Sequence, residues 1–271
     1  MITVELVKLF RRPRTWMTIA LLVSLPTIVA VLLATTHLGP RPGQGPAFLS
    51  AVLTNGSLFS VAALAIVLPL FLPVAVAVVA GDMVAGEAQG GTLRYLLIRP
   101  VGRTRLLVSK LVAIFAFVAV SVVVVAGSGF LLGRLLLGNQ PIEAAVTSVS
   151  GTPLTPGNIV IRTLVAVAYV AFSMLSVAAM ALFLSTLTDS PMTASLGALA
   201  FLIGSSLLLT LDASRAIKPY LPTRYWLSFV DLFRDPILLR NVERGVALQA
   251  VYVLVLLAAA WANFSSKDIT S

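Results

Sequence analysis

Residues 111–133 read LVAIFAFVAVSVVVVAGSGFLLG, a run without a single charged side chain. An α-helix needs about 20 mostly apolar residues to cross the hydrocarbon core of a bilayer. This run is long enough, and its backbone polar groups are all satisfied if it is helical. It therefore predicts a membrane-spanning helix.

The rest of the chain repeats this pattern. Further charge-free stretches lie at 16–34, 58–80, 163–184, 192–210 and 246–264. Of all residues 59% are hydrophobic and only 11% are charged, against about 25% charged in a soluble domain. We therefore expect residues 1–271 to form one all-α integral membrane domain with six transmembrane helices.

The charged side chains gather at the ends of the apolar runs and predict the orientation. Basic residues precede the first span and occupy the 81–110 loop, which places that loop and both termini in the cytoplasm of a cell-membrane protein. Loop 211–245 disagrees, because it holds six basic side chains and four acids, but the first helices usually dominate the orientation. Loop 211–245 is then extracellular or re-entrant. The net charge of +9 is explained by orientation and contact with membrane lipids, so no nucleic-acid partner is expected.

The N-terminal segment 1–14 has helical spacing of apolar residues. Ile2, Leu6, Leu9 and Phe10 share one face, whereas Glu5 and Lys8 lie on another. Such a segment predicts a helix resting in the membrane interface. The alternative is a charge cluster that serves only to orient the first span.

The 81–110 loop has the sequence features of a compact cytoplasmic hairpin. Leu93, Leu96 and Leu97 form a short apolar face, and Pro100 ends that helical pattern. A hairpin with an apolar edge and fixed charges is suited to docking a partner protein. An ordinary solvated loop is the alternative interpretation.

The chain resembles the ABC-2 type transporter permeases in this loop and at both ends. The central match consists of Gly86-Glu87, Gly91-Thr92-Leu93, Leu96-Leu97, Arg99-Pro100-Val101, Arg103 and Lys110. The N-terminal match consists of Glu5, Lys8 and the Arg11-Arg12-Pro13-Arg14 cluster, and the C-terminal match of Phe264 and Lys267-Asp268-Ile269. Ser265-Ser266 stand where Arg is frequent in that family.

The resemblance implies a transport subunit that is not itself an enzyme. Residues 1–14 would be an elbow helix with Glu5, Lys8, Arg11 and Arg12 at its charged positions. The loop would contain the coupling helix that contacts a separate ATP-binding subunit, present in two copies. The expected contact residues are Gly86, Glu87, Gly90, Gly91, Thr92, Arg94, Leu97 and Arg99.

The resemblance also implies a second permease subunit, the same or different, and export of a lipophilic or amphipathic substrate such as a drug, antibiotic or lipid. No Gly-x-x-x-x-Gly-Lys-Ser/Thr occurs, so we expect ATP and Mg²⁺ to be bound by the partner and this chain to bind no cofactor or metal. Pro26, Pro69 and Pro73 are candidate gating kinks.

Two other function classes remain open from the sequence. An ion-coupled secondary transporter would keep titratable residues within its spans, and the six charge-free stretches contain none. A non-transporting membrane scaffold or assembly factor would tolerate replacement of Glu87 or Arg94.

Overall fold

The structure is a computed structural model that describes residues 1–36, 56–91, 102–137 and 155–266. Within these ranges all regular secondary structure is helical. The elements are α1 (Ile2–Arg11), α2 (Pro13–Thr36), η1 (Gly56–Leu58), α4 (Phe59–Val67), α5 (Phe71–Gln89), α7 (Arg103–Leu136), α8 (Pro156–Leu187), α9 (Pro191–Thr210), η2 (Asp212–Ser214), η3 (Lys218–Tyr220), η4 (Trp226–Phe233) and α10 (Leu239–Ser266).

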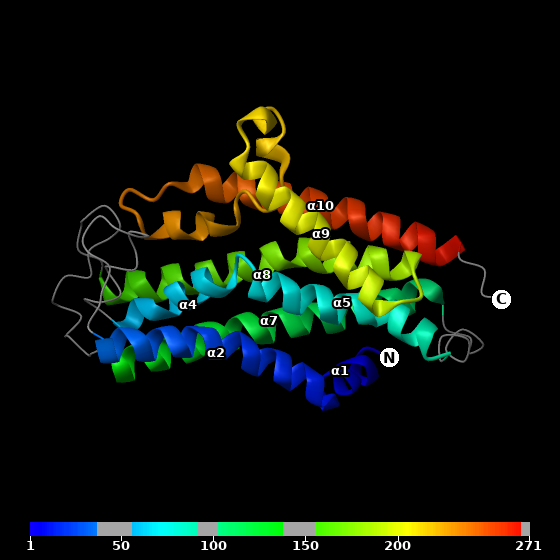
Figure 1. Ribbon diagram of the computed structural model, residues 1–271, viewed down its shortest axis with the longest axis horizontal. Helices are drawn as coiled ribbons and strands as arrows, with labels where there is room; N and C mark the ends of the chain where they lie inside the picture. The colour runs from blue at the N-terminus through cyan, green and yellow to red at the C-terminus, as the bar shows by residue number, and fades with distance from the viewer. Residues whose placement is uncertain (37–55, 92–101, 138–154, 267–271) are drawn as a thin grey trace.

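Six of these helices are long and apolar enough to cross a membrane: α2, α5, α7, α8, α9 and α10. They lie largely along one axis, with α9 inclined to the others (Figure 1). The expectation of an all-helical, multi-pass membrane protein is confirmed. Helix α1, the end of α5, the start of α7 and the end of α10 meet at the same end of the bundle (Figure 1), which we call the α1 end.

The second crossing is not one continuous helix. A turn at 68–70 separates α4 from α5 within the predicted span 58–80. Proline has no N–H, so Pro69 and Pro73 cannot bond the carbonyls four residues before them. By contrast, α2 continues through the buried Pro26 without a break.

The bundle interior is apolar and has α8 at its centre. Helix α8 packs against α5, α7, α9 and α10. Helix α7 approaches α4 closely, because a Cβ on Gly129 would lie 2.8 Å from the Cβ of Ala63 and 3.0 Å from the Cα of Ser60. The small residues of α7 thus permit contact between the two helix backbones.

The hairpin between spans two and three is shorter than the predicted 81–110. Residues 81–89 continue α5, and α7 already begins at Arg103. At the end of α5, Gly90 has φ −79° and Gly91 has φ +66°. A left-handed residue after a helix is the usual place for glycine. The connection therefore turns at Gly91, and residues 92–101 lie outside the described ranges.

The segment after α9 folds back along the bundle. The predicted loop 211–245 ends earlier, because α10 begins at Leu239. The Tyr169 hydroxyl of α8 donates to the Tyr225 carbonyl at 2.6 Å, and the Gln249 amide of α10 donates to the Pro222 carbonyl at 2.7 Å. Buried Phe229 of η4 completes this packing. The side of the membrane on which the segment lies stays a prediction.

Candidate functional site

Helix α1 turns a charged residue toward the bundle. Its buried residues are Glu5 and Leu9, whereas Ile2, Val4 and Val7 are exposed. Glu5, expected on the polar face of α1, is therefore buried in the bundle, whereas the location of α1 in the membrane interface stays a prediction. The physical reason is that Glu5 has a cationic partner inside the bundle.

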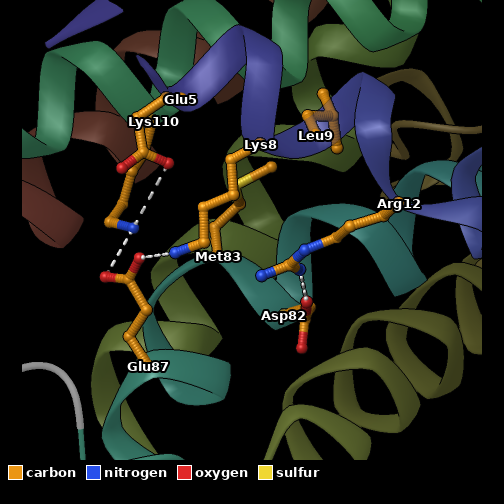
Figure 2. A pocket seen from close by; sticks show the side chains of 8 residues that line it. All are labelled: Glu5, Lys8, Leu9, Arg12, Asp82, Met83, Glu87 and Lys110. Carbon is orange, nitrogen blue, oxygen red and sulfur yellow. Dashed lines mark hydrogen bonds and ion pairs between the residues drawn. The ribbon is translucent and has the colours of Figure 1, made fainter.

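That partner belongs to an ion-pair network joining three helices (Figure 2). Glu87 of α5 contacts two ammonium groups, Lys8 Nζ of α1 at 2.7 Å and Lys110 Nζ of α7 at 2.7 Å. Lys110 also lies 3.8 Å from Glu5 Oε2. We call Glu5, Lys8, Glu87 and Lys110 the three-helix network.

The network is buried at its centre. The Lys110 and Glu87 side chains are 1% and 5% exposed, whereas Lys8 is 41% exposed. Removing a charge from water is unfavourable, and only close pairing in the low-dielectric interior offsets it. The pairing therefore makes the relative positions of α1, α5 and α7 interdependent.

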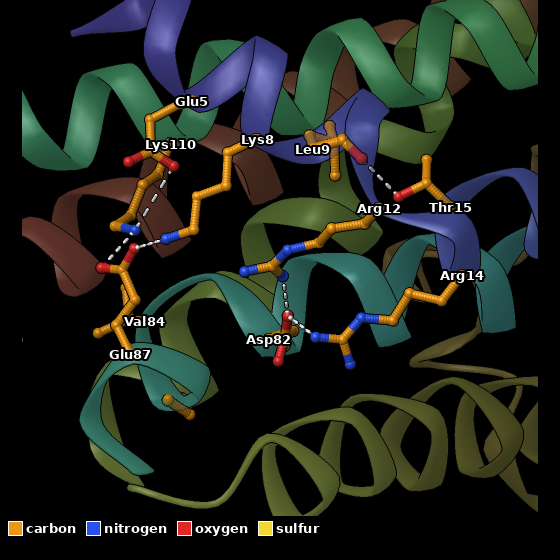
Figure 3. A network of polar contacts seen from close by, with 12 residues as sticks. Glu5, Lys8, Leu9, Arg12, Arg14, Thr15, Asp82, Val84, Glu87 and Lys110 are labelled. Atoms are coloured by element: carbon orange, nitrogen blue, oxygen red, sulfur yellow. Dashed lines mark hydrogen bonds and ion pairs between the residues drawn. The ribbon is translucent and has the colours of Figure 1, made fainter. Parts of the chain in front are cut away.

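A second pair of contacts lies one helical turn away on α5 (Figure 3). Asp82 Oδ2 accepts from Arg12 NH1 at 2.6 Å and from Arg14 NH2 at 3.2 Å. Gly86 leaves room for this carboxylate, because a Cβ there would lie 2.9 Å from Asp82 Cγ. The loop from α1 into α2 is thus anchored to α5.

Helix α5 is also held by a serine of α8. The Ser185 hydroxyl of α8 donates to the Gly81 carbonyl at 2.7 Å and accepts from the amides of Val84 and Ala85. It bridges the two groups, Gly81 C=O and Ala85 N–H, that an uninterrupted α-helix bonds directly. Ser185 therefore ties α8 to the turn 81–85 of α5.

An apolar groove of about 320 Å³ lies at the break in the second crossing. It is bordered by Pro69, Leu70 and Pro73, by one face of α9 and by Trp226 of η4. Non-helical backbone at membrane depth is tolerated where it is buried in protein or lines a cavity.

The predicted residues of the elbow helix and of the ATP-binding-subunit contact divide into four groups. Glu5, Lys8, Glu87 and Arg12 are brought together at the α1 end, and Gly86, Gly90 and Gly91 support the end of α5. Arg11 is exposed. Thr92, Arg94, Leu97 and Arg99 lie outside the described ranges, so their predicted contacts with an ATP-binding subunit stay predictions.

The structure adds Asp82, Lys110 and Ser185 to the predicted site residues. Lys110 belongs to the match with the ABC-2 permeases but not to the contact residues that the resemblance implies. Asp82 had been assigned to a loop because charged residues interrupt the apolar run, although its spacing of five from Glu87 marks two acids near one helix end. Ser185 gave no sequence signal, since its contact depends on the packing of α8 against α5. In the described ranges no three His, Cys, Asp or Glu side chains gather as a metal site.

These features define a multi-pass membrane protein. Ion pairs connect α1, α5 and α7 at one end of the bundle, and the second crossing is interrupted beside an apolar groove. The profile of a protein family described as "Protein of unknown function (DUF2705)" matches residues 21–270. The chain belongs to this family. No curated protein matches it.

Proposed function

We propose that the chain is the permease subunit of an ATP-driven exporter of the ABC-2 type. In this proposal two permease subunits, identical or different, form the path, and two separate ATP-binding subunits supply the energy. One observation carries the proposal beyond the sequence resemblance. Buried Glu87, four residues before the turn at Gly91, is paired with both α1 and α7.

The proposed mechanism uses this network as the link between hairpin and spans. The ATP-binding subunit would contact the connection that contains Thr92, Arg94, Leu97 and Arg99, and its movement would reach the end of α5. Because Glu87 is turned inward to two lysines, its role in the proposal is to carry that movement to α1 and α7. Arg94 retains the role of surface contact.

The proposed substrate is lipophilic or amphipathic. The groove at the helix break has an apolar lining with few polar groups, such as Ser206 and Thr210. Discontinuous membrane helices recur at transport sites, because a short break can open and close without unfolding the helices around it. Pro69 and Pro73 would then define a gate, whereas Pro26 lies within a continuous α2 and has a packing role.

The proposal requires the α1 end to face the cytoplasm, since ATP-binding subunits act there. The cell membrane is the expected location. Both the basic segment before α2 and the turn at Gly91 are at this end, in agreement with the positive-inside rule.

The test is reconstitution in lipid with the ATP-binding subunit encoded beside this chain. We expect the two to co-purify and candidate lipophilic drugs to change the ATPase rate. The double variant Glu87→Leu with Lys110→Met removes the two most buried charges together, whereas Glu5 and Lys8 keep theirs. This variant should still form the complex, but its substrate-stimulated ATPase rate should fall at least about tenfold. That decrease corresponds to a loss of about 1.4 kcal/mol of coupling free energy.

The matched control is Asp212→Asn with Arg215→Gln, which also removes one ion pair. Both side chains are more than four-fifths exposed on η2 and its flank, away from the three-helix network. This control should keep normal stimulation. Failure of the native chain to bind any ATP-binding subunit, or full coupling in the Glu87 and Lys110 double variant, would count against the proposal.

An ion-coupled carrier is the second candidate, and the buried position of Glu87 and Lys110 favours it. A titratable carboxylate near the end of a membrane helix is a common element of proton relays. A carrier of this kind would transport in liposomes driven by a proton gradient with no ATP-binding subunit present. Transport under that condition would replace the exporter proposal.

A further inference from the structure

A cavity of about 90 Å³ lies between the α1–α2 junction and α5. None of the four residues of the three-helix network lines this cavity, and the proposed coupling does not use it. Its polar side carries Arg12 and Arg14, and its apolar side carries Val78 and Val79 of α5. Figure 3 shows both guanidinium groups directed to the same carboxylate oxygen of Asp82.

The charges at this cavity do not balance. The single carboxylate of Asp82 pairs with two guanidinium groups, so the charged residues that line the cavity have a net charge of +1. Arg12 and Arg14 are 34% and 67% exposed, and each uses only part of its five N–H donors on Asp82. Guanidinium groups with free donors bind phosphate oxygens well.

The surroundings indicate that lipid covers this cavity. Val4 and Val7 expose an apolar face of α1, and Val78 exposes an apolar edge of α5 next to the arginines. Trp16 is 53% exposed, and its indole donates to the Phe10 carbonyl. Exposed tryptophan beside basic residues is typical of the level at which lipid head groups lie.

We infer that this cavity binds the phosphate head group of an anionic phospholipid, with an acyl chain against Val78 and Val79. A basic pocket between membrane helices is a recognised way of holding anionic head groups. The inference requires only that the chain is embedded in a bilayer, so it is independent of the exporter proposal. The same phosphate chemistry could be supplied by free inorganic phosphate, which lacks the acyl chain.

The test is native mass spectrometry of the purified full chain in neutral detergent. Phosphatidylglycerol and phosphatidylcholine with the same acyl chains are added in equal amounts, and retained lipid is counted. One net charge near the head group predicts about fivefold preference for phosphatidylglycerol. Equal retention of the two lipids would overturn the inference, and displacement of phosphatidylglycerol by equimolar inorganic phosphate would overturn the assignment to lipid.

Two variants move the result in opposite directions. Arg14→Gln leaves the Arg12–Asp82 pair in place. In this variant phosphatidylglycerol should be retained no better than phosphatidylcholine. Asp82→Asn frees both guanidiniums and should raise phosphatidylglycerol retention about fivefold. An increase cannot arise from unfolding, so this variant separates binding from stability. A decrease or no change on Asp82→Asn would contradict the inference.

The matched control is Arg105→Gln, which removes one exposed positive charge from the start of α7 at the same end of the bundle. It should keep the lipid preference of the native chain. If Arg105→Gln reduces the preference as much as Arg14→Gln, the attraction belongs to the whole basic surface and the specific site is rejected.

Discussion

Lys110 is the most buried member of the three-helix network, and its removal should be the most damaging single change there. Lys110→Met removes one of the two ammonium groups that Glu87 contacts and takes from Glu5 the ammonium group of α7. Breaking a buried ion pair on one side is destabilising by about 3 kcal/mol. Denaturant unfolding in detergent, followed by circular dichroism, measures this loss.

The double variant Glu87→Leu with Lys110→Met provides the control for that measurement. Replacing both partners by apolar side chains removes the stranded charge, so stability should recover in part, although Glu5 still lacks the ammonium group of α7. A double variant less stable than Lys110→Met alone would mean that packing of the two long side chains, not their charges, holds α5 against α7.

Gly91 gives a second prediction for a single residue. Its φ of +66° lies in the left-handed region, and a Cβ there would meet no atom of the described residues within 4 Å. Gly91→Ala should therefore destabilise the protein by about 1 kcal/mol from backbone strain alone. Gly90→Ala, at φ −79°, is the matched control and should have little effect in the same unfolding assay. Equal effects would show that the turn does not need the left-handed conformation.

Among the elements, α5 depends most on its neighbours. Ser185→Ala removes the hydroxyl that bridges Gly81 and Ala85, and the freed groups must re-bond within α5 or stay unpaired. We expect a loss of about 1–2 kcal/mol in the free energy of unfolding. Ser176→Ala is the control, because that buried hydroxyl only bonds the Ser173 carbonyl of its own helix. If both variants lose the same free energy of unfolding, the hydrogen bonds from Ser185 to α5 do not contribute to stability.

The extent of α5 also shows where sequence interpretation stops. Apolar length predicts the number of crossings well, because every backbone group in lipid must bond within its own helix. The same criterion ends a span at its first charge, and so it placed Asp82 and Glu87 in a loop. In the structure the helix continues through both residues, since α1 and α7 supply their partners. Such partners come from tertiary contacts that no local pattern reveals.

At the scale of the molecule, the two ends of the bundle differ in what holds them. The α1 end is fixed by ion pairs between helices distant in sequence. Near the break in the second crossing, the segment after α9 is held by hydrogen bonds to α8 and α10. Helix α5 borders both regions, and in the exporter proposal a movement applied at the first end would reach the groove through it.

The exporter proposal places the α1 end in the cytoplasm, and the absence of cysteine makes this orientation directly testable. Gly90→Cys puts a thiol at the exposed end of α5, and Ala213→Cys puts one on exposed η2 after α9. In intact cells a membrane-impermeant maleimide should label Ala213→Cys but label Gly90→Cys only after the membrane is opened. The reverse pattern would put the turn at Gly91 outside the cell, where no ATP-binding subunit could reach it.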